Sequence, residues 1–219
     1  MKKLMMCFLI GILMIGTVAC GNKTAGNEIA GKDETTGKDD TAEKDVTAQF
    51  KNSVFIGDSI TEGFSFNEIL PSENVMAGAG ATAGYIYEEY MDDLAAKKPD
   101  NVFIMLGSDD MLMPVDDPKA LFESDLTKLI DKIKEEVPDA KIYLQTITPV
   151  TQEALDADGR YKNMDEFNDL IKELAGKLSV NYVDIAAIIN ENPDLFAEDG
   201  VHFKKEFYQM WLDKLSESL

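Results

Sequence analysis

Short apolar runs alternate with longer amphipathic stretches through most of this sequence, and the alternation restricts the folds that the chain can adopt. Five such runs occur, at Ser53 to Ile56, Asn74 to Ala77, Val102 to Leu106, Lys141 to Ile147 and Asn181 to Ile185. Runs of this length and composition are typical of parallel strands that are buried on both faces. Strands that alternate with helices predict an α/β fold, here a three-layer α/β/α sandwich around a mainly parallel, five-stranded sheet.

Two of the intervening stretches carry apolar residues at helical spacing. The stretch Ala120 to Val137 has Leu121, Leu126, Leu129, Ile130 and Ile133 on one face, and a second stripe consists of Phe167, Leu170, Ile171, Leu174 and Leu178. A stripe of this width is the face that an amphipathic helix turns toward a core. We therefore expect both stripes to pack on the sheet. The amphipathic tail from Phe203 to Leu215 is expected to do the same, with Tyr208 and Trp211 as packing residues.

The N-terminus has the organisation of an export signal. Lys2 and Lys3 precede an apolar run from Leu4 to Val18, which is followed by Ala19 and Cys20. This order predicts a signal peptide over residues 1–19. The ending Thr17-Val18-Ala19-Cys20 resembles the lipobox of bacterial lipoproteins, which implies that Cys20 carries lipid and anchors the exported protein to the outer face of the cell membrane. The alternative is an ordinary secretory signal in which Cys20 is incidental.

The composition changes after Cys20. From Gly21 to about Gln49 the chain is rich in Lys, Asp, Glu, Thr, Gly and Ala, and Ile29 and Val46 are its only branched aliphatic residues. Such a segment has too little apolar surface to form a core, which predicts disorder. We therefore divide the sequence into a signal peptide at 1–19, a lipidated cysteine with a disordered acidic linker at 20–49, and one folded domain at 50–219, which is long enough for a core of its own.

The charge balance restricts the partners of the protein. The sequence contains 41 acidic residues against 21 Lys and Arg, which gives a formal net charge of −20. A surface this acidic repels nucleic acid and anionic lipid headgroups, so we expect no nucleic-acid partner and membrane contact through Cys20 only. Cys7 and Cys20 are the two cysteines. A mature chain without Cys7 and with lipid on Cys20 has no thiol for a disulfide, so its stability must come from a packed core.

The one histidine and a serine turn suggest a catalytic site. His202 lies in Asp199-Gly200-Val201-His202, and Ser59 ends the turn Gly57-Asp58-Ser59 after the first apolar run. A serine hydroxyl needs a base to take its proton, and an imidazole titrates near neutral pH. A carboxylate at Asp199 could orient that ring. Ser59, the turn Gly78 to Gly80 and the segment Gly107 to Asp110 each follow a predicted strand, so we expect them along the carboxyl edge of the sheet, where ligands bind.

These segments resemble the sequence blocks of the SGNH, or GDSL-type, hydrolases. Val54 to Gly63 is similar to the nucleophile block, Gly78 to Thr82 to the second block and Asp199 to His202 to the last block. The resemblance implies a flavodoxin-like SGNH hydrolase fold without cofactor or metal, with Ser59 as the nucleophile, His202 as the general base and Asp199 as its orienting carboxylate. It also implies an oxyanion hole formed by the N–H groups of Ser59 and Gly80, with Gly78 as the alternative to Gly80.

The third block departs from the family pattern. In Gly107-Ser108-Asp109-Asp110, Asp109 stands where the family has an asparagine whose amide donates a hydrogen bond to the oxyanion. An ionised carboxylate cannot donate, and losing one oxyanion donor costs about 2.7–4 kcal/mol. Three interpretations are open. Asp109 is protonated and donates, because burial near Asp58, Asp110 and Asp199 raises its pKa; or it points away and leaves a slower enzyme; or the site is degenerate and the fold serves binding.

The leading hypothesis is a surface-tethered serine esterase that hydrolyses acyl esters, in particular acetyl esters, through an acyl-Ser59 intermediate. The exported location favours acetylated glycans of the cell wall or of external polysaccharide as substrates. One alternative is a lipase-type or thioesterase-type acylhydrolase, which would need an apolar acyl channel. The other is a non-catalytic binding lipoprotein. We expect no metal site: Asp156 to Gly159 lacks the later ligands of a calcium loop, and no histidine or thiol accompanies Asp109, Asp110, Asp116 and Asp117.

Overall fold

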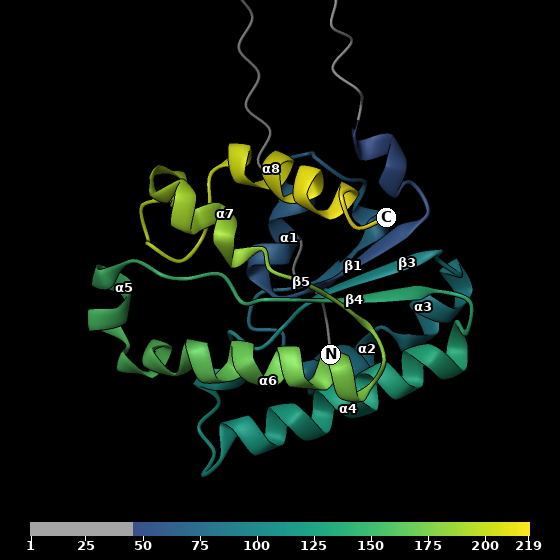
Figure 1. The fold of residues 1–219 in the computed structure, drawn as a ribbon, viewed down its shortest axis with the longest axis horizontal. Helices are drawn as coiled ribbons and strands as arrows, with labels where there is room; N and C mark the ends of the chain where they lie inside the picture. The colour runs from purple at the N-terminus through teal and green to yellow at the C-terminus, as the bar shows by residue number, and fades with distance from the viewer. Residues whose placement is uncertain (1–45) are drawn as a thin grey trace, which may run out of the picture. The chain divides into compact units, whose positions relative to one another are not determined.

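The computed structural model describes residues 46–219 (Figure 1). The expected signal peptide at 1–19, the lipidation site Cys20 and most of the expected linker at 20–49 lie outside the described residues. The end of that linker differs from the expectation, because Val46–Phe50 form a short 3-10 helix in which Val46 and Phe50 are buried. Phe50 contacts Phe55 and Phe103 edge-on. Residues 46–49 therefore belong to the folded domain.

A parallel sheet of five strands forms the middle layer of the domain. The strands are β1 (Ser53–Gly57), β2 (Val75–Ala77), β3 (Asn101–Met105), β4 (Lys141–Gln145) and β5 (Asn181–Val183), in the spatial order β2-β1-β3-β4-β5. Ile56 of β1 lies opposite Met76 on one side and Ile104 on the other. The predicted five-stranded α/β fold is confirmed. Strands β4 and β5 end two residues earlier than expected, where the hydroxyl of Thr146 accepts hydrogen bonds from the N–H groups of Ile185 and Ala186.

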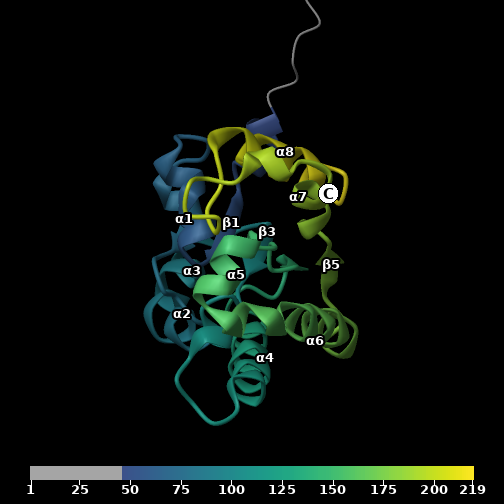
Figure 2. The same cartoon turned by 90° about the vertical axis from the view of Figure 1, so that its left-hand side faces the viewer.

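Helices cover both faces of the sheet (Figures 1 and 2). One face carries α1 (Ser59–Phe66), α7 (Ala186–Glu191) and α8 (Lys205–Ser216); the other carries α2 (Ala83–Glu89), α3 (Met91–Lys97), α4 (Pro118–Glu136) and α6 (Met164–Lys177). Helix α5 (Gln152–Ala157) lies between β4 and α6 in the chain. Because successive strand residues point to opposite faces, Val54 and Ile56 join the core on the α4 side, and Phe55 joins the aromatic core on the α8 side.

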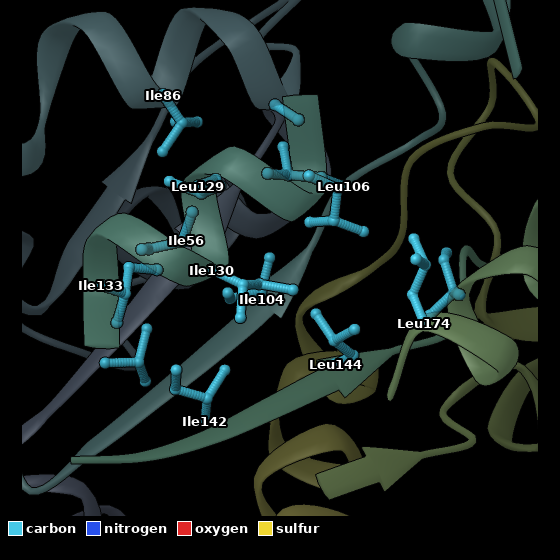
Figure 3. Packing of buried hydrophobic residues seen from close by; sticks show 14 of the residues in the cluster. Ile56, Ile86, Ile104, Leu106, Leu129, Ile130, Ile133, Ile142, Leu144 and Leu174 are labelled. Atoms are coloured by element: carbon cyan, nitrogen blue, oxygen red, sulfur yellow. The ribbon is translucent and has the colours of Figure 1, made fainter. Parts of the chain in front are cut away.

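The core on the α4 side is mainly aliphatic, and Figure 3 shows how strands and helices meet in it. Both predicted helical stripes contribute to this core, with two exceptions. Leu121 is 38% exposed and Phe122 is buried in its place, where the Phe122 ring stacks on Phe167 with 5.3 Å between ring centroids. Leu178 follows the end of α6 as its C-cap and is only partly buried. Leu121 and Phe122 are neighbours and both apolar, so only the packing decides which of them faces the core.

The tail helix α8 packs on the sheet as expected. Trp211 is fully buried, and its ring N–H donates a hydrogen bond of 2.6 Å to the side chain of Gln145 at the end of β4. Tyr208 and Trp211 both contact Phe64 of α1. Since α8 begins three residues after His202, this aromatic packing holds the start of α8 close to α1. None of the helices in residues 46–219 has the length and apolar character needed to cross a bilayer.

Candidate active site

Ser59 is the first residue of α1 and follows the turn that ends β1. Asp58 precedes it as the N-cap, and its carboxylate accepts a hydrogen bond of 2.9 Å from the N–H of Ile60, which starts the helix. A side chain at Gly57 would overlap the hydroxyl of Thr61 and the backbone oxygen of Met105. The absence of a side chain at Gly57 thus allows the turn to pass close to the end of β3, with Ser59 at the carboxyl edge of the sheet.

The structure brings the three predicted catalytic residues into one hydrogen-bonded chain. The Nε2 atom of His202 lies 2.8 Å from Oγ of Ser59, and the Nδ1 atom lies 2.6 Å from Oδ2 of Asp199. With its proton on Nδ1, the imidazole donates to Asp199 and leaves Nε2 free to accept the proton of Ser59. This is the geometry that a serine nucleophile, its base and an orienting carboxylate require.

The other carboxylate oxygen of Asp199 holds the backbone of the same loop. Oδ1 accepts hydrogen bonds from the N–H groups of Val201 at 3.0 Å and His202 at 2.9 Å. Burial acts to raise the pKa of Asp199, but these bonds, the bond from the His202 ring and the charge of His202 outweigh it and lower the pKa to about 2. Asp199 is therefore ionised at neutral pH and can stabilise a protonated His202.

The loop that carries His202 is held by two further contacts. The N–H of Ala197 donates to the backbone oxygen of His202 at 2.8 Å, which closes the loop on itself. The N–H of Thr151 donates to the oxygen of Gly200 at 2.9 Å. Gly200 has a φ of +69°, and a side chain there would overlap the hydroxyl of Thr151. Thr151 is the N-cap of α5, and no local sequence pattern marks it as part of the site, because the contact joins distant segments.

Gly80 lies in the loop between β2 and α2. Its φ is +76°, a backbone conformation that favours glycine. A Cβ added at either Gly78 or Gly80 meets no atom within 4 Å, so there is open space beside both glycines. The loop is held at its far end, where the N–H of Ala83 donates a 3.0 Å hydrogen bond to Oδ1 of Asp110. The positive φ supplies a physical reason for glycine at position 80, the predicted oxyanion donor.

Asp109 follows β3 at the same edge of the sheet. Its side chain is half-buried and makes no capping hydrogen bond to the 3-10 helix Asp110–Leu112. Burial raises the pKa of Asp109, and the charge of His202 partly offsets the increase. The charge of Asp109 in turn adds to the raised pKa values of Asp58 and Asp110. Asp199, expected in the same group, is paired with His202 instead. The shift has the direction that a protonated Asp109 requires.

Two buried carboxyl groups, those of Asp58 and Asp110, lie near Asp109, and no sequence pattern predicts a separate role for either. Burial raises the pKa of Asp58 to about 6, although hydrogen bonds from Ser108 and from backbone N–H groups oppose the increase. Burial also raises the pKa of Asp110 to about 7. The hydroxyl of Ser108 donates to Oδ2 of Asp58. The sequence shows these acids after apolar runs, but their burial depends on packing between distant segments.

The other acidic segments serve as local acceptors. Asp158 forms an ion pair with Arg160 at 2.6 Å, and Asp156 accepts a hydrogen bond from Gln152. Asp117 is the N-cap of α4 and accepts from the N–H of Ala120 at 3.0 Å. Across residues 46–219, no three His, Cys, Asp or Glu side chains are grouped in a way that could hold a metal ion.

Several solved structures share this fold. A GDSL-like lipase from Bacteroides thetaiotaomicron matches with a TM-score of 0.64 and 18% identity over 78% of this chain and 88% of its own. An acetyl xylan esterase matches with a TM-score of 0.57 and 18% identity, over 76% of this chain and 99% of its own. An acetylxylan esterase from Geobacillus stearothermophilus matches with a TM-score of 0.55 and 22% identity, over 75% and 91%. At these sequence identities, the matches show that the proteins share a fold with this chain.

Comparison of the amino-acid sequence with known families is more specific than these matches of fold. No curated protein matches the chain. Residues 55–210, however, match the GDSL-like lipase/acylhydrolase family, a span that begins in β1 and ends in α8 and so contains Ser59, Asp199 and His202. The protein therefore belongs to the GDSL-like lipase/acylhydrolase family, as its sequence blocks predict, and is an enzyme that hydrolyses ester bonds.

Proposed function

We propose that the protein is a serine esterase that removes small acyl groups, in particular acetyl groups, through a covalent acyl-Ser59 intermediate. The observation that carries this proposal is the hydrogen-bonded chain from Ser59 Oγ through the His202 ring to Asp199, with distances of 2.8 and 2.6 Å. A nucleophile, a base within hydrogen-bond reach and a third group that orients the base are the parts that acyl transfer to serine needs.

The reaction follows from this geometry. Ser59 Oγ attacks the ester carbonyl carbon while Nε2 of His202 takes the hydroxyl proton, and Asp199 stabilises the resulting imidazolium. His202 then gives that proton to the alcohol oxygen as the ester bond breaks, which leaves an acyl-Ser59 ester. Water attacks this ester with His202 again as base, the acid product leaves, and Ser59 regains its proton.

The negative oxygen of each tetrahedral intermediate needs hydrogen-bond donors. We assign this role to the N–H groups of Ser59 and Gly80, which lie at the carboxyl ends of β1 and β2. Asp109 supplies a third donor when its carboxyl group is protonated, since a neutral acid can donate one hydrogen bond. The raised pKa of Asp109 extends the pH range in which it is neutral.

For the substrate we propose an acetyl ester on a glycan. Two proteins of similar fold, noted above, are acetyl xylan esterases, and a glycan outside the cell is within reach of an exported enzyme.

We further propose export and anchoring to the outer face of the bacterial membrane through lipid on Cys20, on the basis of the N-terminal sequence alone. In a bacterial host the full chain should fractionate with membranes, and Cys20→Ala should release it; an unchanged distribution would refute the anchor.

The central test is hydrolysis of p-nitrophenyl acetate by the full chain and by Ser59→Ala. We expect the variant to lose nearly all turnover and all labelling by a fluorophosphonate, since covalent labelling requires an activated hydroxyl. Ser65→Ala, in the same helix, is the matched control. Equal rates for Ser59→Ala and the unaltered chain would refute the mechanism, and an unreactive Ser59 would support the binding-protein alternative.

A substrate panel separates the acyl classes. We expect release of acetate from acetylated xylan or from O-acetylated peptidoglycan, and little hydrolysis of p-nitrophenyl palmitate. Faster turnover of the palmitate ester than of the acetate ester would favour the lipase alternative.

A further inference from the structure

The segment Gly107–Asp110, which we term the β3 turn, contacts the two loops that carry the proposed nucleophile Ser59 and the proposed oxyanion donor Gly80. Strand β3 pairs with β1 but not with β2, because the order in the sheet is β2-β1-β3. The β3 turn nevertheless contacts the turn after β1 and the loop after β2. It makes both contacts through side chains on either side of Asp109.

The first contact fixes the nucleophile turn. The Ser108 hydroxyl donates to Oδ2 of Asp58, while Oδ1 of Asp58 accepts from the N–H of Ile60. Asp58 is 1% exposed and Ser108 9% exposed. One oxygen of Asp58 therefore starts α1 at Ser59, and the other ties that helix start to the β3 turn.

The second contact fixes the loop that contains Gly80. Oδ1 of Asp110 accepts the N–H of Ala83 at 3.0 Å, and the two residues are 27 positions apart in the sequence. Asp110 is 4% exposed, and within residues 46–219 its Oδ2 atom is buried without a hydrogen-bond partner. Placing a carboxyl group there costs desolvation free energy, so packing alone does not account for an acid at this position.

The β3 turn is itself rigid. The N–H of Met111 donates to the oxygen of Gly107 at 2.9 Å, and the N–H of Leu112 donates to the oxygen of Asp109 at 3.0 Å. Gly107 has a φ of +121°, and an added Cβ would lie 2.8 Å from Ile147 and 3.0 Å from Phe122. A rigid segment with one contact to each neighbouring loop can set the spacing between them.

We propose that Ser108 and Asp110, the neighbours of Asp109 in the chain, are positioning residues that hold the Ser59 turn and the Gly80 loop at a constant separation. This role rests on the proposed esterase mechanism and adds to it the residues that assemble the oxyanion hole. Hydrogen-bond donors stabilise a transition state only when they are already aimed at the developing charge. Loss of either contact should therefore lower the rate of the chemical step more than it weakens substrate binding.

The test compares Asp110→Ala with Asp110→Asn in the full chain. The alanine variant removes the acceptor for the Ala83 N–H, whereas the asparagine variant keeps an oxygen in its place. We expect Asp110→Ala to lower kcat for p-nitrophenyl acetate by about 10-fold to 100-fold with KM changed less than about twofold, and to speed hydrogen exchange in a peptide spanning residues 80–85. Asp110→Asn should recover most of both losses. Ser108→Ala should lower kcat and the rate of fluorophosphonate labelling of Ser59.

Asp131→Ala and Ser124→Ala, both exposed on α4, are the matched controls. Unchanged kcat in Asp110→Ala despite faster exchange would overturn the proposal, as would equal losses in the alanine and asparagine variants. If Asp110→Ala fails to fold, the rates of Ser108→Ala and Asp110→Asn test the proposal in its place. A wild-type kcat in Ser108→Ala would then overturn the proposal. Failure of the esterase mechanism itself would look different, because the unaltered chain would then show no Ser59-dependent turnover.

Discussion

At the scale of single residues, Asp109 is the position at which the site departs from the family pattern. It stands at the edge of the sheet near His202, Asp58 and Asp110, and only His202 in this group can carry positive charge. A neutral Asp109 can donate to an oxyanion, and an ionised Asp109 would repel it. His202, in contrast, must be neutral to act as a base. With Asp109 as a third donor, the proposed reaction therefore needs a protonated Asp109 and an unprotonated His202 in the same molecule.

Asp109→Asn should raise turnover of p-nitrophenyl acetate in alkaline solution, because an amide donates at every pH. One oxyanion donor corresponds to a factor of about 10²–10³ in rate, which sets the upper limit of the gain. The wild-type rate should fall as pH rises through the raised pKa of Asp109, and the variant should lack this fall. Rate profiles over the whole pH range in which the protein stays folded measure both effects, with exposed Asp116→Asn as control. A variant-to-wild-type ratio that does not change with pH would contradict a protonated donor.

At the scale of elements, the His202 loop depends on helices on either side of it. Its C-terminal side continues into α8, which is held by the buried Trp211 and Tyr208. Its middle is held by Thr151 at the start of α5, through the bond to the oxygen of Gly200. The distance between Nε2 of His202 and Oγ of Ser59 is therefore set by two helices that contact the loop from separate parts of the chain.

Gly200→Ala should disturb this loop in two ways. The backbone conformation at φ +69° costs an alanine about 1–2 kcal/mol, and the new methyl group overlaps the Thr151 hydroxyl. We expect the free energy of unfolding to fall by at least the first amount and kcat to fall by about 10-fold to 100-fold, measured by urea denaturation and by ester hydrolysis. Gly176→Ala in α6, where an added Cβ meets no atom, should be neutral or stabilising. Unchanged kcat in Gly200→Ala would show that the loop tolerates displacement.

At the scale of the whole molecule, stability is coupled to pH through buried acids. Burial raises the pKa of Asp58 to about 6 and that of Asp110 to about 7 in the folded protein, whereas both groups ionise near pH 4 in the unfolded chain. Between these values the unfolded chain releases protons that the folded protein keeps, so the free energy of unfolding decreases as pH rises. Asp199 has the opposite effect, because its pKa is lowered to about 2 in the folded protein. As pH falls below about 4, the unfolded chain binds a proton at Asp199 before the folded protein does, so the free energy of unfolding decreases.

Urea denaturation at pH 5 and pH 8 should therefore show a lower free energy of unfolding at pH 8. The net charge of −20 adds repulsion in the same direction. Asp110→Asn does not titrate at this position, so its loss of stability between pH 5 and pH 8 should be smaller than that of the unaltered protein. Exposed Asp131→Asn serves as the control. The same loss in Asp110→Asn as in the unaltered protein would show that Asp110 does not contribute to the pH dependence.

The amino-acid sequence was sufficient for the sheet and its layers, because strands buried on both faces must be apolar throughout and helices on a sheet must carry an apolar stripe. It also placed Ser59, His202 and Asp199 in recognisable blocks at strand ends and in the loop before the tail helix. Its prediction of Leu121 as a core residue of α4 was wrong, because the neighbouring apolar residue Phe122 fits the helical period equally well and is the one that is buried.

Tertiary structure alone decided the contacts that support the site. Thr151 meets Gly200, Ser108 meets Asp58 and Asp110 meets Ala83, each across at least 27 residues of sequence in which no local pattern records the contact. It also decided the pKa values of Asp58 and Asp110, because these depend on how much water packing removes from each carboxyl group. The sequence determines which groups are present, whereas their distances and their hydration are properties of the folded chain.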